Sequence, residues 1–158
     1  MSKQPNSRSC FVCGRENPNG LKMTFYEVSP GEILAEYTVS ERFQGYPGVV
    51  HGGIIASMLD EATGRSHMGV GSSRFMVTAS LSIRYLRPVP VGKPLKILGH
   101  AREYHGKVSK AVGEIIGPEG ELLARAEAVL VDIPQETIAA YDPAALGWQV
   151  DPDGGEGL

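Results

Sequence analysis

The chain has 158 residues, an apolar fraction of 42% and a formal net charge of −3 at pH 7. This length suits a single domain whose core needs no disulfide or metal to hold it together. No apolar run approaches the roughly 18 residues of a membrane span, and residues 1–9 are polar, without the apolar stretch of a secretory signal. The two cysteines, Cys10 and Cys13, are too few for a secreted disulfide scaffold and are typical of a reducing cytoplasm. These features exclude a helical membrane protein, a disulfide mini-protein and a fully disordered chain, and they predict a cytoplasmic location.

The charge is unevenly distributed along the chain. Residues 1–9 carry +2 and residues 134–158 carry −5, so the body between them is neutral. A protein that binds a phosphate backbone needs a basic surface, and this chain lacks one. Nucleic acid is therefore not expected as a partner.

The first third of the chain predicts an irregular lead-in, a hairpin and a loop. Residues 1–20 are rich in Asn, Ser, Pro and Gly. In residues 21–39, two runs rich in β-branched and aromatic side chains flank Pro30-Gly31, a dipeptide that favours a tight turn. Residues 42–50 contain two glycines and a proline and predict a loop.

Residues 53–64 predict one long helix. At 100° per residue the apolar side chains fall within an arc of about 140°; they are Ile54, Ile55, Met58, Leu59 and Ala62. The opposite face holds Gly53, Ser57, Asp60 and Gly64. Small residues allow a ligand or another backbone to approach, so Asp60 is not expected to point into open water. Glu61 lies at the flank of this face.

Residues 75–87 alternate with a period of two, which predicts a strand with one buried face. One side holds Phe75, Val77, Ala79, Leu81, Ile83 and Tyr85, and the other holds Thr78, Ser80, Ser82 and Arg84.

The remaining elements predict a meander and a tail. Residues 95–104 and 108–116 are joined by a glycine-containing turn, and a second turn at Gly117–Gly120 leads into residues 121–133. This last run has helix propensity, but the flanking turns favour a strand, because tertiary pairing often overrides propensity. In the tail, residues 137–141 predict a short helix.

The element order β-β-α-β-β-β-β has connections too short for parallel crossovers, which predicts an α+β fold with an antiparallel sheet. We expect three segments: a lead-in at residues 1–20, a domain at residues 21–133, and an acidic tail at residues 134–158. Within the tail, Trp148 is the expected anchor and residues 151–158 are expected to be disordered.

The helix start is the densest candidate for chemistry. Gly52-Gly53 leaves backbone N–H groups without a side chain in front of them, at the positive end of the helix dipole, where they can hold a developing oxyanion. A carboxylate two turns later, Asp60, can act as general base or nucleophile. Alternatively, the glycines only turn the chain, His51 caps the helix and Asp60 is a surface residue.

These residues also carry a resemblance. Residues 50–62, Val-His-Gly-Gly-Ile-Ile-Ala-Ser-Met-Leu-Asp-Glu-Ala, resemble the signature of the PaaI-type hotdog-fold acyl-CoA thioesterases. Residues 77–88, Val-Thr-Ala-Ser-Leu-Ser-Ile-Arg-Tyr-Leu-Arg-Pro, resemble the strand that follows in that family. The resemblance covers residues 21–133 and implies an antiparallel sheet wrapped around one long central helix. It further implies hydrolysis of an acyl-CoA without a cofactor, by a homodimer with shared active sites or by a homotetramer built from two such dimers.

The resemblance also assigns roles. Asp60 matches the catalytic carboxylate, the Gly52 N–H matches the group that polarises the thioester carbonyl, Gln44 matches a residue that places the water or substrate, and Thr78 matches one that assists the nucleophile. His51 either hydrogen bonds toward the thioester or ties the loop to the helix, and we favour the second role slightly.

Further candidates concern substrate binding. They are Gly53 at the helix start, Phe43, Tyr46 and Met76 for the acyl group, and Arg84 and Arg87 for the coenzyme A phosphates. For the aromatic residues and Met76 the alternative is ordinary core packing, and for the arginines it is a solvated strand end, which is the stronger reading. Glu61 is the runner-up to Asp60 as the catalytic carboxylate.

No metal site is predicted. Cys10-Phe-Val-Cys13-Gly14 resembles half of a zinc knuckle, but the sequence has no second cysteine pair. His67, His100 and His105 have no partner at ligand spacing.

Spacing along the helix predicts that the site is shared between chains. Gly52 and Asp60 are eight residues apart, or about 12 Å at 1.5 Å per residue, whereas a bound carbonyl and its attacking water must lie about 3–3.5 Å apart. Two antiparallel helices across a two-fold axis would bring one chain's Asp60 beside the other chain's Gly52. Two other functions stay open: a non-catalytic acyl-CoA binding or sensing protein, and a hotdog hydratase or dehydratase. The acyl group, and the choice between a CoA and a carrier-protein thioester, also stay open.

Overall fold

A computed structural model describes residues 1–69 and 74–152. Its strands are β1 (Ser2–Lys3), β2 (Tyr26–Ser29), β3 (Glu32–Thr38), β4 (Met76–Tyr85), β5 (Pro94–His105), β6 (Val108–Ile116) and β7 (Leu122–Asp132). Its helices are the 3-10 turn η1 (Glu41–Phe43), α1 (Gly52–Ser66), α2 (Gln135–Ala139) and α3 (Pro143–Leu146). None of the helices in the described ranges is long and apolar enough to cross a membrane.

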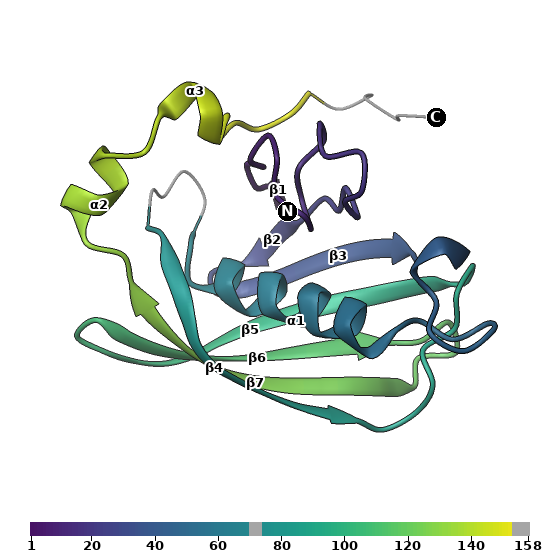
Figure 1. Cartoon of the computed structure of the whole chain (residues 1–158). Coiled ribbons are helices and arrows are strands. Elements are labelled where there is room, and N and C mark those ends of the chain that lie inside the picture. Colours follow the sequence, from purple (N-terminus) through teal and green to yellow (C-terminus); the bar gives the residue numbers. More distant parts are fainter. Residues whose placement is uncertain (70–73, 153–158) are drawn as a thin grey trace.

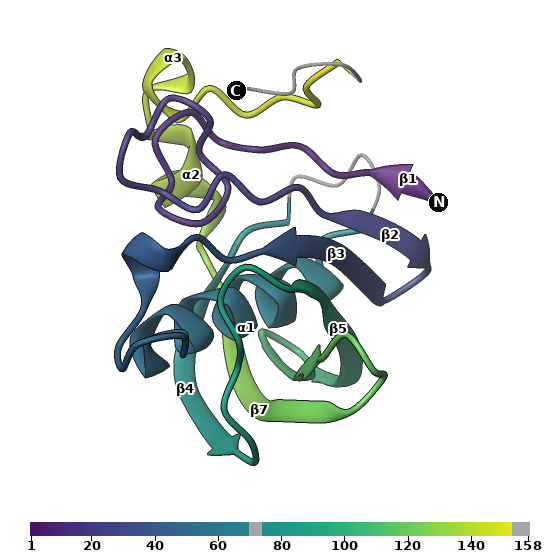
Figure 2. The same cartoon turned by 90° about the vertical axis from the view of Figure 1, so that its right-hand side faces the viewer.

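The seven strands form one antiparallel sheet in the order β1-β2-β3-β5-β6-β7-β4. The sheet curves around α1, which lies along its concave side (Figures 1 and 2). The predicted turns are present, and Gly31, Gly106 and Gly120 occupy them with φ of 79°, 63° and 84°, where a residue without Cβ is favoured. The predicted hotdog architecture is confirmed, with β1 and α3 as elements that the sequence did not indicate and α2 beginning two residues before the short helix expected at residues 137–141.

Two strand glycines let α1 lie close to the sheet. A Cβ on Gly99 would stand 2.1 Å from the carbonyl oxygen of Ala62, and one on Gly113 would stand 3.1 Å from Leu59 Cδ2. Close contact of this kind is a known reason for glycine inside a strand. The buried helix face meets the sheet over Ile55, Met58, Leu59, Ala62 and Thr63.

The run at residues 121–133 is a strand, as predicted against its helix propensity. β7 pairs with β6 on one side and with β4 on the other, and it buries Ala124, Ala126 and Ala128. Two ladders of backbone hydrogen bonds outweigh the small intrinsic preference of alanine for helix.

β4 departs from the simple alternation that its sequence predicts. Thr78 pairs with Leu130 and Ser80 pairs with Val129, so Ala79 is the extra residue of a β-bulge. The bulge reverses the alternation, so Thr78 lies on the same face as Leu81 and Ile83, toward α1, and not on the opposite face. The prediction of one buried face is also wrong for the single chain, because most of β4 is exposed.

The two terminal segments lie together over the end of α1 (Figure 1). Trp148 meets the edge of the Phe75 ring, with ring centroids 5.2 Å apart, and is the anchor that the sequence predicted. Asp151 was expected to be disordered, but it forms an ion pair with Arg15 (2.5 Å) and accepts a hydrogen bond from Asn6. The expectation for residues 153–158 lies outside the described residues.

Candidate functional site

Asp60 and Thr78 meet between α1 and β4. The Thr78 hydroxyl donates a hydrogen bond of 2.6 Å to Asp60 Oδ1. Asp60 is half-buried on α1, and the bulge at Ala79 is what turns Thr78 toward it. The hydroxyl orients the carboxylate and leaves its second oxygen for another partner.

The start of α1 presents a backbone N–H. His51 is the N-cap, and its Nδ1 accepts a hydrogen bond of 2.9 Å from the Gly53 N–H. Within residues 1–69 and 74–152, the Gly52 N–H has no hydrogen-bond acceptor. The first turn of α1 therefore offers the Gly52 N–H to a ligand, with the helix dipole behind it.

Tyr85, which no motif in the sequence marks as a site residue, contacts this helix start. Its hydroxyl donates to the carbonyl oxygen of Gly52 at 3.1 Å. The alternation of β4 already placed Tyr85 on the face of Leu81 and Ile83, and this was the signal that could have found it.

Gln44 closes the loop before α1. Its side-chain oxygen accepts a hydrogen bond of 3.0 Å from the Gly48 N–H, and Gly48 has a φ of 82°. In the described part of this chain, no contact joins the Gln44 side chain to Asp60 or Thr78. Gln44 and Gly52 thus lie at one end of α1, and Asp60 and Thr78 lie two turns away.

Glu61, the runner-up carboxylate, faces the N-terminal segment. One of its oxygens pairs with the Arg65 guanidinium at 2.8 Å, and the other lies 3.9 Å from Cys10 Sγ. Cys10 and Cys13 are free thiols. The Cys13 hydrogen bond, together with backbone N–H groups, lowers the pKa of Cys10 to about 6, while that same hydrogen bond and burial raise the pKa of Cys13.

The predicted substrate-binding residues are not gathered in one place. Phe43 is half-buried near the helix start, and Tyr46 is 83% exposed in the preceding loop. Met76, at the other end of the site, packs against the small cluster that contains Leu130. Arg84 and Arg87 are exposed near the end of β4.

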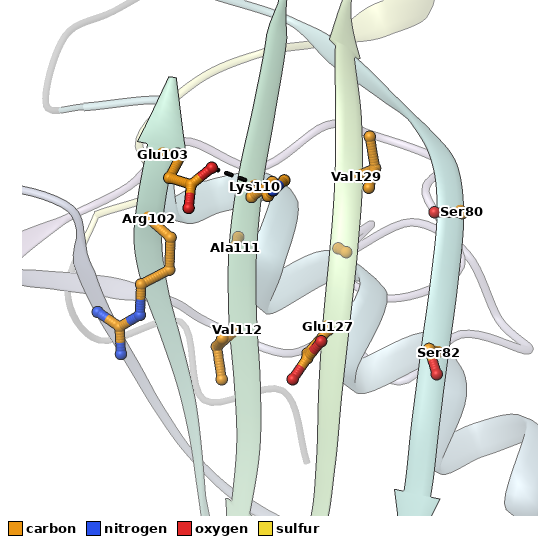
Figure 3. A pocket seen from close by; sticks show the side chains of 10 residues that line it. Ser80, Ser82, Arg102, Glu103, Lys110, Ala111, Val112, Glu127 and Val129 are labelled. Atoms are coloured by element: carbon orange, nitrogen blue, oxygen red, sulfur yellow. Dashed lines mark hydrogen bonds and ion pairs between the residues drawn. The ribbon is translucent and has the colours of Figure 1, made fainter. Parts of the chain in front are cut away.

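A hollow of about 780 Å³ lies on the convex face of the sheet, with α1 behind the strands (Figure 3). Its lining comes from β4, β5, β6 and β7 and includes Ser82, Lys110 and Glu127. There are two smaller hollows. One of about 600 Å³ has Asp132 in its lining, and one of about 360 Å³ has Tyr37 in its lining. Neither Asp60 nor Gly52 lines any of these three hollows.

Comparison with known proteins finds similarity to one family. Residues 47–124 match the model of the thioesterase superfamily. The acyl-coenzyme A thioesterase 13 of Homo sapiens is 25% identical over 104 residues, which are 60% of this chain and 74% of that protein. The acyl-coenzyme A thioesterase THEM4 of Rattus norvegicus is 30% identical over 83 residues, and the match spans 52% of this chain but only 35% of that protein.

Solved structures agree with the fold. A thioesterase superfamily protein is 30% identical with a TM-score of 0.71, covering 78% of this chain and 63% of its own. The E. coli PaaI protein is 19% identical with a TM-score of 0.66, covering 72% and 81%. A Streptococcus mutans protein bound to acetyl-CoA is 20% identical with a TM-score of 0.63, covering 70% and 88%. The chain is therefore similar to the thioesterase superfamily over residues 47–124, and it shares the hotdog fold of the PaaI structure.

Proposed function

We propose that this protein hydrolyses an acyl-CoA thioester to the free acid and CoA. The observation that carries the proposal is the Thr78–Asp60 hydrogen bond on a helix whose first N–H is available. The relatives named as acyl-CoA thioesterases and the neighbour solved with acetyl-CoA support the substrate class. The free cysteines support a reducing, cytoplasmic location.

In the proposed mechanism, the free oxygen of Asp60 takes a proton from water. The water oxygen forms a bond to the thioester carbonyl carbon, and the Gly52 N–H stabilises the negative charge that develops on the carbonyl oxygen. The C–S bond then breaks, and the CoA thiolate receives the proton that Asp60 holds. The second form of the proposal has Asp60 attack the carbonyl directly, with water cleaving the resulting anhydride. One turnover in ¹⁸O-labelled water separates the two forms. The general-base form puts one ¹⁸O into the product acid, whereas direct attack followed by attack of water on the Asp60 carbonyl leaves the product acid unlabelled and puts the ¹⁸O into Asp60.

The site is proposed to form between two chains. Gly52 and Asp60 are separated by about 12 Å along α1, too far for one carbonyl and one water. The small-residue face of α1 includes Gly64, where an added Cβ would meet nothing within 4 Å among the residues that the structure describes. β4 is the last strand of the sheet and leaves Val77 and Tyr85 more than half exposed. An antiparallel two-fold contact along this edge would place each Asp60 beside the partner chain's Gly52, and a pair of such dimers would form the tetramer.

The first experiment compares Asp60→Asn with wild type on a panel of acyl-CoA thioesters, with release of free thiol as the readout. Asn keeps the volume and removes the base, so kcat should fall by on the order of 10² to 10⁴ while the melting temperature holds. Glu127→Gln, an exposed carboxylate on the convex face, is the control.

Three results would contradict the proposal. Near-normal turnover in Asp60→Asn with an inactive Glu61→Gln would move the role to Glu61. Binding of acyl-CoA without thiol release would indicate a sensing protein, and a change in enoyl absorbance without thiol release would indicate a hydratase or dehydratase.

A further inference from the structure

Three side chains with metal-binding donors meet beside α1, at the N-terminal segment. They are Cys10, Cys13 and Glu61, and their donor atoms lie within 4.8 Å of one another. The sequence alone predicts no metal site because a second cysteine pair is missing. The fold instead brings a carboxylate to the pair from a helix 51 residues away.

The loop that carries the two cysteines directs backbone N–H groups at the Cys10 sulfur. The backbone N–H groups of Val12 and Cys13 both donate to Cys10 Sγ, at 3.3 and 3.4 Å. The chain then folds back tightly, because the Gly14 N–H donates to the Cys10 carbonyl oxygen at 2.9 Å. A Cβ on Gly14 would stand 2.4 Å from two backbone atoms of Cys10, so only glycine fits.

Glu61 is oriented toward this loop by Arg65. The guanidinium is 1% exposed and holds one carboxylate oxygen at 2.8 Å, which leaves the other oxygen directed at Cys10 Sγ. Metal-ligating carboxylates are commonly fixed by a hydrogen bond of this kind from outside the ligand set. Two thiolates and one carboxylate carry −3, which a divalent cation and Arg65 together neutralise.

We propose that Cys10, Cys13 and Glu61 bind a zinc ion that fastens the N-terminal segment to α1. Zinc prefers tetrahedral sulfur and oxygen ligands at about 2.3 and 2.0–2.2 Å, so its sulfur and oxygen ligands stand about 3.6 Å apart. The distance of 3.9 Å between Cys10 Sγ and Glu61 Oε2 needs only a small contraction. Thiolate ligands are soft and disfavour magnesium and calcium. The fourth coordination position of the zinc ion is taken by water, beside the half-exposed Cys10. The inference does not depend on the proposed hydrolysis.

The test measures bound metal in the full chain, purified under reducing conditions from zinc-supplemented cultures. We expect about one zinc per chain by mass spectrometry of the metal content. Titration with Co²⁺ should give the near-ultraviolet thiolate charge-transfer band and the strong visible bands of a tetrahedral site. Cys10→Ser and Glu61→Gln should each weaken the metal affinity by about 100-fold or more, since changes even outside the ligand set cost 10–100-fold.

Glu16→Gln is the matched control, because Glu16 is an exposed carboxylate of the same segment that pairs with Arg8. It should bind metal as the wild type does. Zinc should also raise the melting temperature of the wild type and of Glu16→Gln, but not that of Glu61→Gln, which keeps an oxygen for Arg65.

Three outcomes would overturn the proposal. The first is metal content in the wild type no greater than in Cys10→Ser. The second is unchanged affinity in Glu61→Gln, which would remove the carboxylate from the site. The third is a reduced chain that takes up no zinc and oxidises instead to a Cys10–Cys13 disulfide, seen as a loss of both free thiols.

Discussion

The side chain of Thr78 has one task in this structure, which is to hold Asp60. Its hydroxyl donates to Asp60 Oδ1 at 2.6 Å, and the residue is exposed on β4, so it contributes little to packing. A carboxylate that accepts one hydrogen bond keeps its second oxygen in a defined direction, which is what a base acting on a bound water needs.

Thr78→Ala should therefore lower kcat by about 10-fold, as loss of an assisting interaction of about 1.4 kcal/mol would. Thr78→Ser keeps the hydroxyl and should keep most of the activity. The measurement is kcat by thiol release together with a melting curve for each variant. Unfolding of Thr78→Ala would instead assign the residue a structural role.

Arg65 performs a different task at the same scale. It is 1% exposed, pairs with Glu61, and donates to the carbonyl oxygen of Pro5 at 3.0 Å. Its guanidinium lies over the rings of Phe25 and Trp148, at 4.6 and 5.7 Å from their centroids. One side chain thus joins α1 to both terminal segments.

Arg65→Met should lower the free energy of unfolding by about 3 kcal/mol, because it leaves Glu61 without its buried partner. This value is at the low end for breaking a buried ion pair, since 21% of the Glu61 side chain is exposed to water. Denaturant unfolding measures the loss. Arg125→Met removes a surface pair with Glu114 and should cost no more than about 1 kcal/mol. Equal losses in the two variants would contradict a special role for Arg65.

At the scale of elements, the C-terminal tail packs against the N-terminal segment and against Phe75. Asn6 and Gln149 exchange backbone hydrogen bonds, the Arg8 N–H donates to the Leu146 carbonyl, and Trp148 packs on Phe75. The backbone contacts link residues more than a hundred positions apart, and the ring contact links residues 73 positions apart, so the tail alone carries none of them.

Deletion from Gln135 onward should lower the melting temperature, because it removes the Trp148 contacts and the Asp151–Arg15 pair. An aromatic pair contributes about 0.5–1.5 kcal/mol, and in a chain of this size each kcal/mol corresponds to about 2–4 °C. A shift of several degrees in a thermal melt is the expected result. An unchanged melting temperature would mean that the tail does not dock.

At the scale of the whole molecule, the proposed active site requires two chains. The structure puts Gln44 and Gly52 at the start of α1 and Asp60 and Thr78 about two turns further along the helix, so the proposed oxyanion donor and the proposed base are apart in one chain. The open edge of β4 offers a surface on which two copies can meet.

Complementation tests this arrangement. Asp60→Asn is mixed and refolded with a chain that carries Gln44→Ala and Gly52→Pro, each of them inactive alone. Proline suits the first position of a helix and removes only its N–H, and a Cβ at Gly52 has ordinary contact distance to the Tyr85 ring. Random pairing makes about half of the dimers mixed, with one intact site of two, so about a quarter of wild-type activity should return.

The control for complementation uses a different tag on each of the two chains, so that isolation by one tag and detection of the other shows that mixed dimers form. If mixed dimers form and the mixture stays inactive, the site lies within one chain.

The sequence by itself was enough to predict the main helix and strands and the motif of a Gly52-Gly53 pair followed by Asp60. Turn chemistry at Pro30-Gly31 and Gly117–Gly120, the helical period around Asp60 and the Gly52-Gly53 pair are all short-range signals, so one sequence suffices to detect them. They led to an α+β fold with an antiparallel sheet and to the pairing of a helix start with a carboxylate, and the hotdog fold was implied by the resemblance that the motif residues carry.

Only the tertiary structure decided which side chains meet. Thr78 reaches Asp60 because pairing with β7 forces a bulge at Ala79, and Cys10 reaches Glu61 because the N-terminal segment docks on α1. Arg65 is buried for the same reason, although the pattern of the helix alone put no arginine in the core. Periodicity reports which face a residue occupies within its own element, whereas strand register and the docking of distant segments depend on contacts between elements, which no local pattern contains.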